Sequence, residues 1–226
     1  MPVSSAGARQ AVVAAIQAGD RALLARLLRD DPALAGLPTP DGLSPLRLAL
    51  YRHQPALVED LLAVLPPVAL SVHDAAAAGV VDRLAALLQA EPGVANALAA
   101  DGFPPLALAA YFGQRAAVEL LLAYGATVTT AAANGSRVTA LHAALAGPEP
   151  EIARLLVAAG ADVNARQQGG YTPLHSVAAN GRLALAELLV AAGAEPGATN
   201  DAGQTPSDLA RQAGHVDVAE ALLSGS

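Results

Sequence analysis

Five histidines are the residues of this sequence best suited to chemistry, because an imidazole can move protons or bind a metal ion near neutral pH. They are His53, His73, His142, His175 and His215. None is paired with a carboxylate at a spacing typical of a metal site. The chain has no cysteine, which excludes disulfides, thiol nucleophiles and cysteine-ligated zinc. We therefore expect the histidines to be structural.

Other catalytic patterns are missing as well. All 13 basic residues are arginine, which excludes a phosphate-loop lysine and a Schiff-base lysine. There is no nucleophile elbow, no His-Glu-x-x-His motif and no glycine-rich phosphate loop. The paired carboxylates are best interpreted as solvated helix ends and faces; they are Asp30 and Asp31, Glu149 and Glu151, and Asp217 and Glu220. We expect no catalytic residue, no cofactor and no metal, so an enzyme is the least favoured function.

The charge argues against nucleic acid as a partner. The net charge is −7, and residues 137–226 hold nine acidic residues against five arginines. Binding a phosphate backbone needs a clustered basic surface, which this sequence lacks. We expect instead a protein partner whose basic charge complements the acidic C-terminal half.

The apolar segments are short. No run approaches the ~20 residues of a membrane-spanning helix, so we expect no membrane insertion. Residues 11–18 are apolar, but Gln17 and the lack of a basic start argue against a signal peptide. We expect a cytoplasmic protein, with secretion or a periplasmic location as the alternative. The bias toward alanine and arginine is typical of a GC-rich bacterial genome.

The elements that position the candidate residues repeat along the chain. The clearest unit contains Thr172, Pro173, Leu174 and His175, followed by glycine and a pair of leucines. Units start near residues 11, 45, 71, 105, 140, 173 and 206, a period of about 33 residues. A longer repetition relates residues 41–62 to residues 101–122. Such repeats indicate a solenoid, in which each unit buries its apolar face against its neighbours.

Local signals place two helices in each unit. A hydroxyl residue before proline, as in Thr172-Pro173, predicts an N-cap followed by the first helical residue. Ser71 and Asp74 predict a capping box displaced by one residue. Glycines predict left-handed helix ends, at Gly79, Gly113, Gly181 and Gly214 for the first helix and at Gly125, Gly160 and Gly193 for the second.

The connections between units are predicted from their turn residues. Asp41-Gly42, Asp101-Gly102 and Gly169-Gly170 predict the tight turns of projecting hairpins. Only 26 residues separate the units at 45 and 71, and Pro66-Pro67 lies in this link. We expect a local kink or a missing hairpin there. Departures from the pattern are His53 and Pro148, which replace glycine, and Arg211, which suits a C-terminal cap.

At these residues, above all Thr172-Pro173-Leu174-His175, the sequence resembles the ankyrin repeat family over essentially the whole chain. The resemblance implies an all-α fold, a curved α-solenoid of about seven helix-turn-helix repeats with β-hairpin or loop fingers and a concave face. Residues 11–226 would form a single domain after a disordered tail over residues 1–10. It also implies that His73, His142 and His175 hydrogen-bond to the backbone near the hairpins.

The resemblance further implies protein binding through the finger tips and the exposed face of the first helices. On that side we expect a partner-binding set of Tyr51, Arg52, Phe103, Tyr111, Phe112 and Tyr171, since aromatic residues and arginine dominate interface energies. The alternative is that these aromatics pack between adjacent repeats. We predict a monomeric adaptor or regulator; the alternative is a homodimer or self-assembling structural protein.

Overall fold

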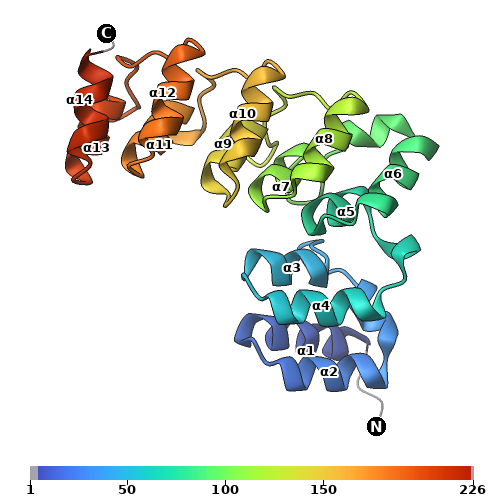
Figure 1. The fold of residues 1–226 in the computed structure, drawn as a ribbon. Helices are drawn as coiled ribbons and strands as arrows, with labels where there is room; N and C mark the ends of the chain where they lie inside the picture. Colours follow the sequence, from blue (N-terminus) through green and yellow to red (C-terminus); the bar gives the residue numbers. More distant parts are fainter. Residues whose placement is uncertain (1–4, 225–226) are drawn as a thin grey trace.

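Residues 5–224, which the computed structural model describes, form seven helical pairs stacked side by side in a bent row (Figure 1). The first helices are α1 Ser5–Ala18, α3 Pro45–Tyr51, α5 Val72–Ala78, α7 Pro105–Tyr111, α9 Ala140–Ala146, α11 Pro173–Ala179 and α13 Pro206–Gln212. The second helices are α2 Arg21–Asp30, α4 Pro55–Val64, α6 Val81–Ala90, α8 Arg115–Ala123, α10 Pro150–Ala158, α12 Leu183–Ala191 and α14 Val216–Ser224. The predicted α-solenoid of seven repeats is confirmed.

Several first helices begin at the capping residues that the sequence predicts. Proline is the first helical residue of α3, α7, α11 and α13, and the side chain of Thr205 accepts a hydrogen bond from the backbone N–H of Asp208. In the third repeat the cap is Ser71, whose side chain accepts from the backbone N–H of Asp74. The repeat frame there therefore starts at Val72 rather than at residue 71. This places Asp74, and not His73, in the helical position that His142 and His175 occupy.

Each second helix turns a narrow apolar stripe toward the core. The buried residues recur four positions apart, as expected for one face of a helix. The pairs are Leu24 and Leu28, Leu57 and Leu61, Leu84 and Leu88, Ala117 and Leu121, Ile152 and Leu156, Leu185 and Leu189, and Val218 and Leu222. Because neighbouring pairs touch, the core is continuous along the row.

The first helix is longer than predicted. α1 begins at Ser5, so the prediction of a disordered tail over residues 1–10 is wrong for residues 5–10. Ala8 is partly buried against the core, which gives this extra turn of helix a packing partner. The rest of the predicted tail, residues 1–4, lies outside the described residues.

The fingers are loops rather than β-hairpins. No strand occurs in residues 5–224, and the nearest approach to one is a single antiparallel bridge between Ala131 and Thr139. Each loop is closed by a backbone hydrogen bond, such as Gln167 N–H to Tyr171 O at 2.9 Å. Successive fingers are also joined, by Gln168 N–H to Ser136 O at 2.8 Å and by Asp201 N–H to Gly169 O at 2.9 Å.

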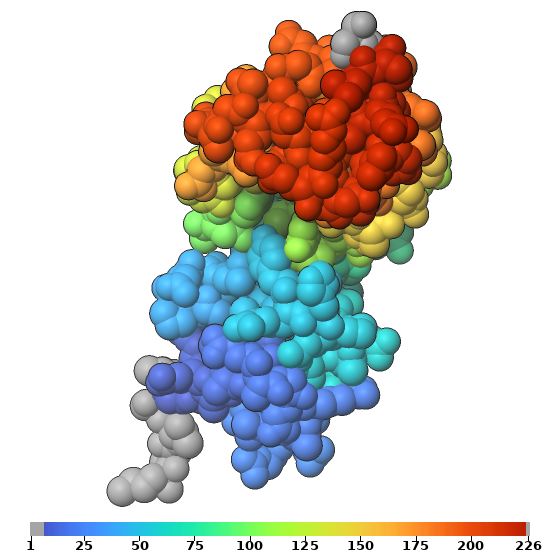
Figure 2. All heavy atoms as spheres, turned by 90° about the vertical axis from the view of Figure 1, so that its left-hand side faces the viewer, coloured from blue at the N-terminus to red at the C-terminus, as the bar shows by residue number. Residues whose placement is uncertain are grey.

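One finger is missing, as the short link predicts. Between α4 and α5 the chain forms only a 3-10 turn, η2 (Pro67–Ala69), which follows Pro66. The row bends at this point, so that α3 faces the later repeats across the inside of the curve (Figure 1). In the space-filling view the surface recedes to the green middle repeats between the cyan and red parts (Figure 2). The inside of this bend is the concave face.

Two departures from the glycine pattern have structural explanations. His53 ends α3 in the left-handed region with φ of 52°, the conformation that glycine supplies elsewhere. Gly147, before Pro148, lies against the backbone of α7, where a Cβ atom would meet the carbonyl oxygens of Tyr111 and Ala110 at 2.8 and 2.9 Å. This glycine allows the fifth repeat to approach the fourth.

Candidate functional site

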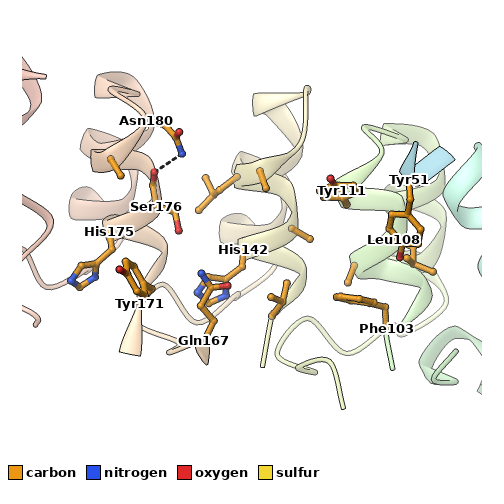
Figure 3. Close-up of a pocket in the computed structure, with 16 residues that line it drawn as sticks. Tyr51, Phe103, Leu108, Tyr111, His142, Gln167, Tyr171, His175, Ser176 and Asn180 are labelled. Atoms are coloured by element: carbon orange, nitrogen blue, oxygen red, sulfur yellow. Dashed lines mark hydrogen bonds between the residues drawn. The ribbon is translucent and has the colours of Figure 1, made fainter. Parts of the chain in front are cut away.

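An apolar groove of about 530 Å³ lies on the concave face, over α7, α9 and α11 (Figure 3). Its floor consists of short side chains, Ala107, Ala143, Ala146 and Ala179, together with Leu108 and Leu145. Aromatic residues rise on both sides, with Phe103 and Tyr111 at one end and Tyr171 at the other (Figure 3). The hollow exists because the fifth repeat presents alanines between repeats that present aromatic rings.

Three aromatics from repeats that are not adjacent in sequence meet at one end of the groove. The ring centroids of Tyr51 and Phe112 are 5.3 Å apart, those of Tyr51 and Tyr111 are 6.3 Å apart, and those of Tyr111 and Phe112 are 5.0 Å apart. Such tilted contacts stabilise beyond the burial of apolar area. Repeats two and four touch in this way because α5 between them offers only alanines on its C-terminal half.

The structure brings four of the six residues predicted to bind a partner into one groove. Tyr51, Phe103, Tyr111 and Tyr171 all line it. Phe112 is half-buried and does not line the groove, but its ring contacts Tyr51 and Tyr111, which do. The cluster therefore combines packing between repeats with exposure to the groove. Arg52 is exposed at the end of α3 and does not line the groove.

The groove also contains two histidines that the sequence suggests are structural. His142 and His175 each face the N-cap of their own helix, with Nδ1 2.9 Å from the Thr139 hydroxyl and 2.8 Å from the Thr172 hydroxyl. His175 Nε2 lies 3.0 Å from the Gln204 carbonyl oxygen. Burial lowers the pKa of His142 to about 4 and also lowers the pKa of His175, so both rings are neutral at neutral pH.

The remaining histidines also have packing roles. His73 Nε2 lies 2.9 Å from the Ala97 carbonyl oxygen, in the loop that leads to the next finger. The expected hydrogen bonds to backbone near the fingers are therefore present at His73 and His175. At His142 the prediction is wrong for Nε2, which is buried without a hydrogen-bond partner among the described residues. His215 lies over Gly181 of the preceding repeat, and His53 ends α3.

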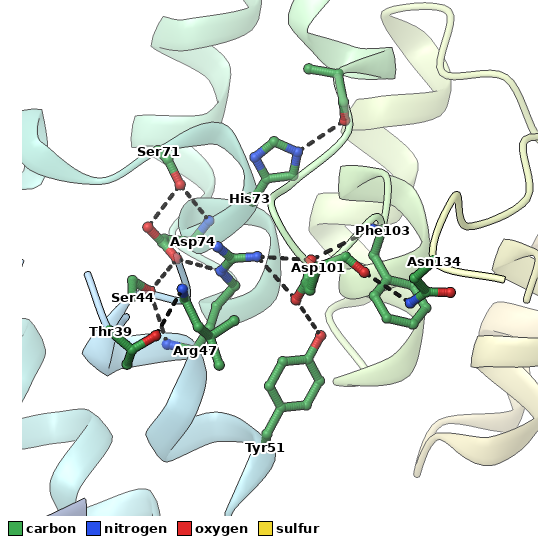
Figure 4. Close-up of polar contacts among 12 residues, drawn as sticks. Thr39, Ser44, Arg47, Tyr51, Ser71, His73, Asp74, Asp101, Phe103 and Asn134 are labelled. Atoms are coloured by element: carbon green, nitrogen blue, oxygen red, sulfur yellow. Dashed lines mark hydrogen bonds and ion pairs between the residues drawn. The ribbon is translucent and has the colours of Figure 1, made fainter. Parts of the chain in front are cut away.

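A buried ionic network spans the bend beside the groove (Figure 4). Arg47 on α3 is 5% exposed, and its Nε lies 3.0 Å from Asp74 Oδ1 on α5. Its Nη1 lies 3.2 Å from Asp101 Oδ1, in the finger before α7. The Tyr51 hydroxyl donates to Asp101 Oδ2 at 3.1 Å, and burial together with the Asp101 carboxylate raises the pKa of Tyr51 above its ordinary value.

Hydroxyl groups complete this network. Asp74 accepts from Ser44 Oγ at 2.6 Å and from Ser71 Oγ at 2.7 Å, so two successive N-cap residues hold one carboxylate. The finger that carries Asp101 is fixed from its other side, because Asn134 Nδ2 donates to the Asp101 carbonyl oxygen at 2.8 Å. The network therefore ties repeats two, three, four and five together where a finger is missing.

The sequence did contain a signal for this network. Arg47 is the third residue of its helix, the position that His142 and His175 occupy in later repeats, and Asp74 occupies the same position in the next repeat. A positive charge and a negative charge at equivalent positions of neighbouring repeats predict an ion pair between them. The sequence contained no such signal for the contacts of Asp101 with Arg47 and Tyr51, which form where the third repeat lacks a finger.

The chemistry of the groove is that of apolar contact. None of the residues lining it is Asp, Glu or Arg. Within residues 5–224, no group of three or more histidine or carboxylate side chains is placed to hold a metal ion. No helix in that part of the chain is long and apolar enough to cross a membrane.

The comparisons with known proteins agree with the architecture. The family model described as ankyrin repeats (3 copies) matches residues 72–167 and residues 147–226, together more than half of the chain. No curated protein matches the sequence. Proteins of this family generally mediate protein–protein interactions and are typically not enzymes. The matched residues and the seven stacked helical pairs show that the chain belongs to the ankyrin repeat family.

Proposed function

We propose that this protein is an adaptor or regulator that binds a partner protein through the groove on its concave face. The observation that carries the proposal is the groove itself, an apolar hollow of about 530 Å³ walled by Tyr51, Phe103, Tyr111 and Tyr171. These are four of only six aromatics in the chain. Interfaces gain most of their binding energy from a few buried aromatic anchors.

The surroundings of the groove suit the same role. Arg52 is exposed near the aromatic end, where it can contribute to a polar rim. The acidic surplus of residues 137–226 favours basic residues in the parts of the partner that lie outside the groove. Such long-range complementarity would raise the association rate more than the affinity.

The proposal is tested by affinity capture from extracts of the organism of origin, comparing wild type with Tyr111→Ala and Tyr124→Ala. Tyr111 lines the groove, whereas Tyr124 is a half-buried tyrosine at the end of α8 outside it. We expect Tyr111→Ala to lose specific partners that Tyr124→Ala retains. Equal recovery of every partner by the two variants would contradict the placement of the site.

Self-assembly is the competing function. The last helix exposes Val216 and Leu223, which are 58% and 52% accessible. Sedimentation of the purified protein over a range of concentrations separates the two functions. A monomer throughout the range agrees with an adaptor, whereas dimers at micromolar concentration would favour self-assembly.

A further inference from the structure

The groove has no charged lining, which restricts what can occupy it. Its residues are aliphatic, aromatic or neutral polar, and both of its histidines are held neutral by burial. A charged group placed on this floor would lose its hydration without gaining an opposite charge. The contact face of the occupant must therefore be uncharged.

The floor also lacks partners for a polypeptide backbone. Ala107, Ala143, Ala146 and Ala179 offer only methyl groups. The nearby finger amides are already used, since Gln168 N–H donates to Ser136 and Asp201 N–H donates to Gly169. An extended segment would bring one N–H and one C=O per residue onto this surface with few partners. A helix satisfies these groups internally and can present an apolar face.

The dimensions agree with a helix. The walls belong to repeats four and six, with α9 between α7 and α11 (Figure 3). Packed helices lie about 8–10 Å apart, so the walls stand on helices roughly 16–20 Å apart. An α-helix with its side chains is about 10–12 Å wide, and alanines beneath it allow close approach.

We propose that the groove takes one α-helix of the partner protein, laid over α9 with an uncharged apolar face between Tyr111 and Tyr171. This inference rests on the proposed function and adds the conformation and chemistry of the bound segment. The Tyr111 and Tyr171 hydroxyls and the Gln167 side-chain amide have no hydrogen-bond partner among residues 5–224. They border the floor and would meet polar residues flanking the apolar face of the helix.

A second copy of this chain is a poorer occupant. Within the described residues, its α-helix with exposed large apolar residues is α14, which presents Val216 and Leu223; the other two such residues, Val68 and Leu98, lie in the η2 turn and in a loop. Glu220 lies between Val216 and Leu223 on the same face, at the i+4 position from Val216. Docking α14 would place this carboxylate on the alanine floor. Self-association is accordingly an outcome that would overturn the inference.

The experiment uses two displayed peptide libraries, selected on the full chain. One library varies positions i, i+3, i+4 and i+7 of a stabilised helix, and the other holds extended, proline-containing peptides of similar length. The best peptide from each is titrated by fluorescence anisotropy against wild type, Ala146→Trp and Ala158→Trp. Ala146 is exposed on the groove floor, and Ala158 is exposed on α10 outside the groove. Circular dichroism checks that both variants remain folded.

We expect the helical library to yield binders with uncharged residues at the varied positions. Their affinity should fall at least about tenfold, roughly 1.4 kcal/mol, in Ala146→Trp and stay unchanged in Ala158→Trp. Groove-dependent binders only from the extended library, or helical binders with charged contact positions, would overturn the inference and leave the proposed function standing. The absence of any binder sensitive to Ala146→Trp would contradict both. A dimer of the chain that Ala146→Trp abolishes would assign the groove to a second copy.

Discussion

Arg47 and Asp101 are 54 residues apart in the sequence, yet the Arg47 guanidinium lies 3.2 Å from both carboxylate oxygens of Asp101. The contact joins the second repeat directly to the finger of the fourth, because the third repeat has no finger that would separate the two residues. The same carboxylate accepts from Tyr51, a wall of the groove. The bend of the solenoid and one end of the candidate binding site therefore depend on a single network.

The network predicts that Arg47→Met strongly destabilises the protein. The substitution would leave Asp74 and Asp101 partly buried without their cation, and breaking a buried pair in this way costs about 3–5 kcal/mol of unfolding free energy. Urea denaturation measures the change. Arg21→Met is the control, since the Arg21–Asp60 ion pair is exposed and its loss should barely move the midpoint. Equal midpoints for the two variants would show that the network contributes little.

The substitution Tyr51→Phe tests the contribution of Tyr51 to the ionic network separately from its contribution to the groove. The variant loses the hydroxyl that donates to Asp101 at 3.1 Å but keeps the ring that lines the groove. We expect the unfolding free energy to fall by about 1 kcal/mol, the value of one hydrogen bond. Partner binding measured at a temperature where the variant is folded should be unchanged. A large loss of binding would mean that the hydroxyl itself contacts the partner.

The lowered pKa of His142 predicts that the folded protein becomes less stable as the pH falls. Burial lowers its pKa from 6.5 to about 4 in the folded protein, so between these values the unfolded chain binds more protons. Stability should therefore fall as the pH decreases through this range, by about 3 kcal/mol from His142 alone. His73 and His175, whose pKa values burial also lowers, act in the same direction.

The check is urea denaturation of wild type and His142→Gln at about pH 7.5 and about pH 5. The variant lacks the titrating ring and should lose less stability between the two conditions, although it is less stable at the higher pH because its capping interaction with Thr139 changes. An identical pH dependence in both proteins would contradict the assignment to His142.

Gly147→Ala should disturb the packing of the fifth repeat on the fourth. The new methyl group would lie 2.8 Å from the Tyr111 carbonyl oxygen, and backbone cannot move aside cheaply. We expect a loss of about 1–3 kcal/mol, as for other overpacked positions. Gly197→Ala is the matched control, because no atom lies within 4 Å of its added Cβ. Thermal unfolding that does not distinguish the two variants would show that the repeats can separate without cost.

Much of the fold was predictable because its signals are local. The hydroxyl residues before Pro45, Pro173 and Pro206 cap three of the first helices and determine where these begin. Each of these capping residues lies within one turn of the helix that it starts. The repeat period then gives the stacking, since an isolated helical pair cannot bury its apolar stripe. The exception was the start of α1, where small residues carry no clear cap.

The site was only partly predictable because it depends on contacts between distant residues. The repeat phase placed Tyr51 and Tyr111 on one face, but their contact follows from the missing finger and the alanines of α5. The floor of the groove had no sequence signal of its own, since the sequence does not distinguish Ala143 and Ala146 from the many other alanines of the inward-facing helices.

Site-specific photo-crosslinking in the native host tests the central claim most directly. A photoreactive phenylalanine analogue at position 146 would lie on the groove floor, and the same residue at position 158 would lie on α10 outside it. We predict that a discrete partner protein crosslinks from position 146 and not from position 158, and that Tyr111→Ala removes the product. Crosslinks of equal yield from both positions, or none from position 146, would contradict binding through the groove.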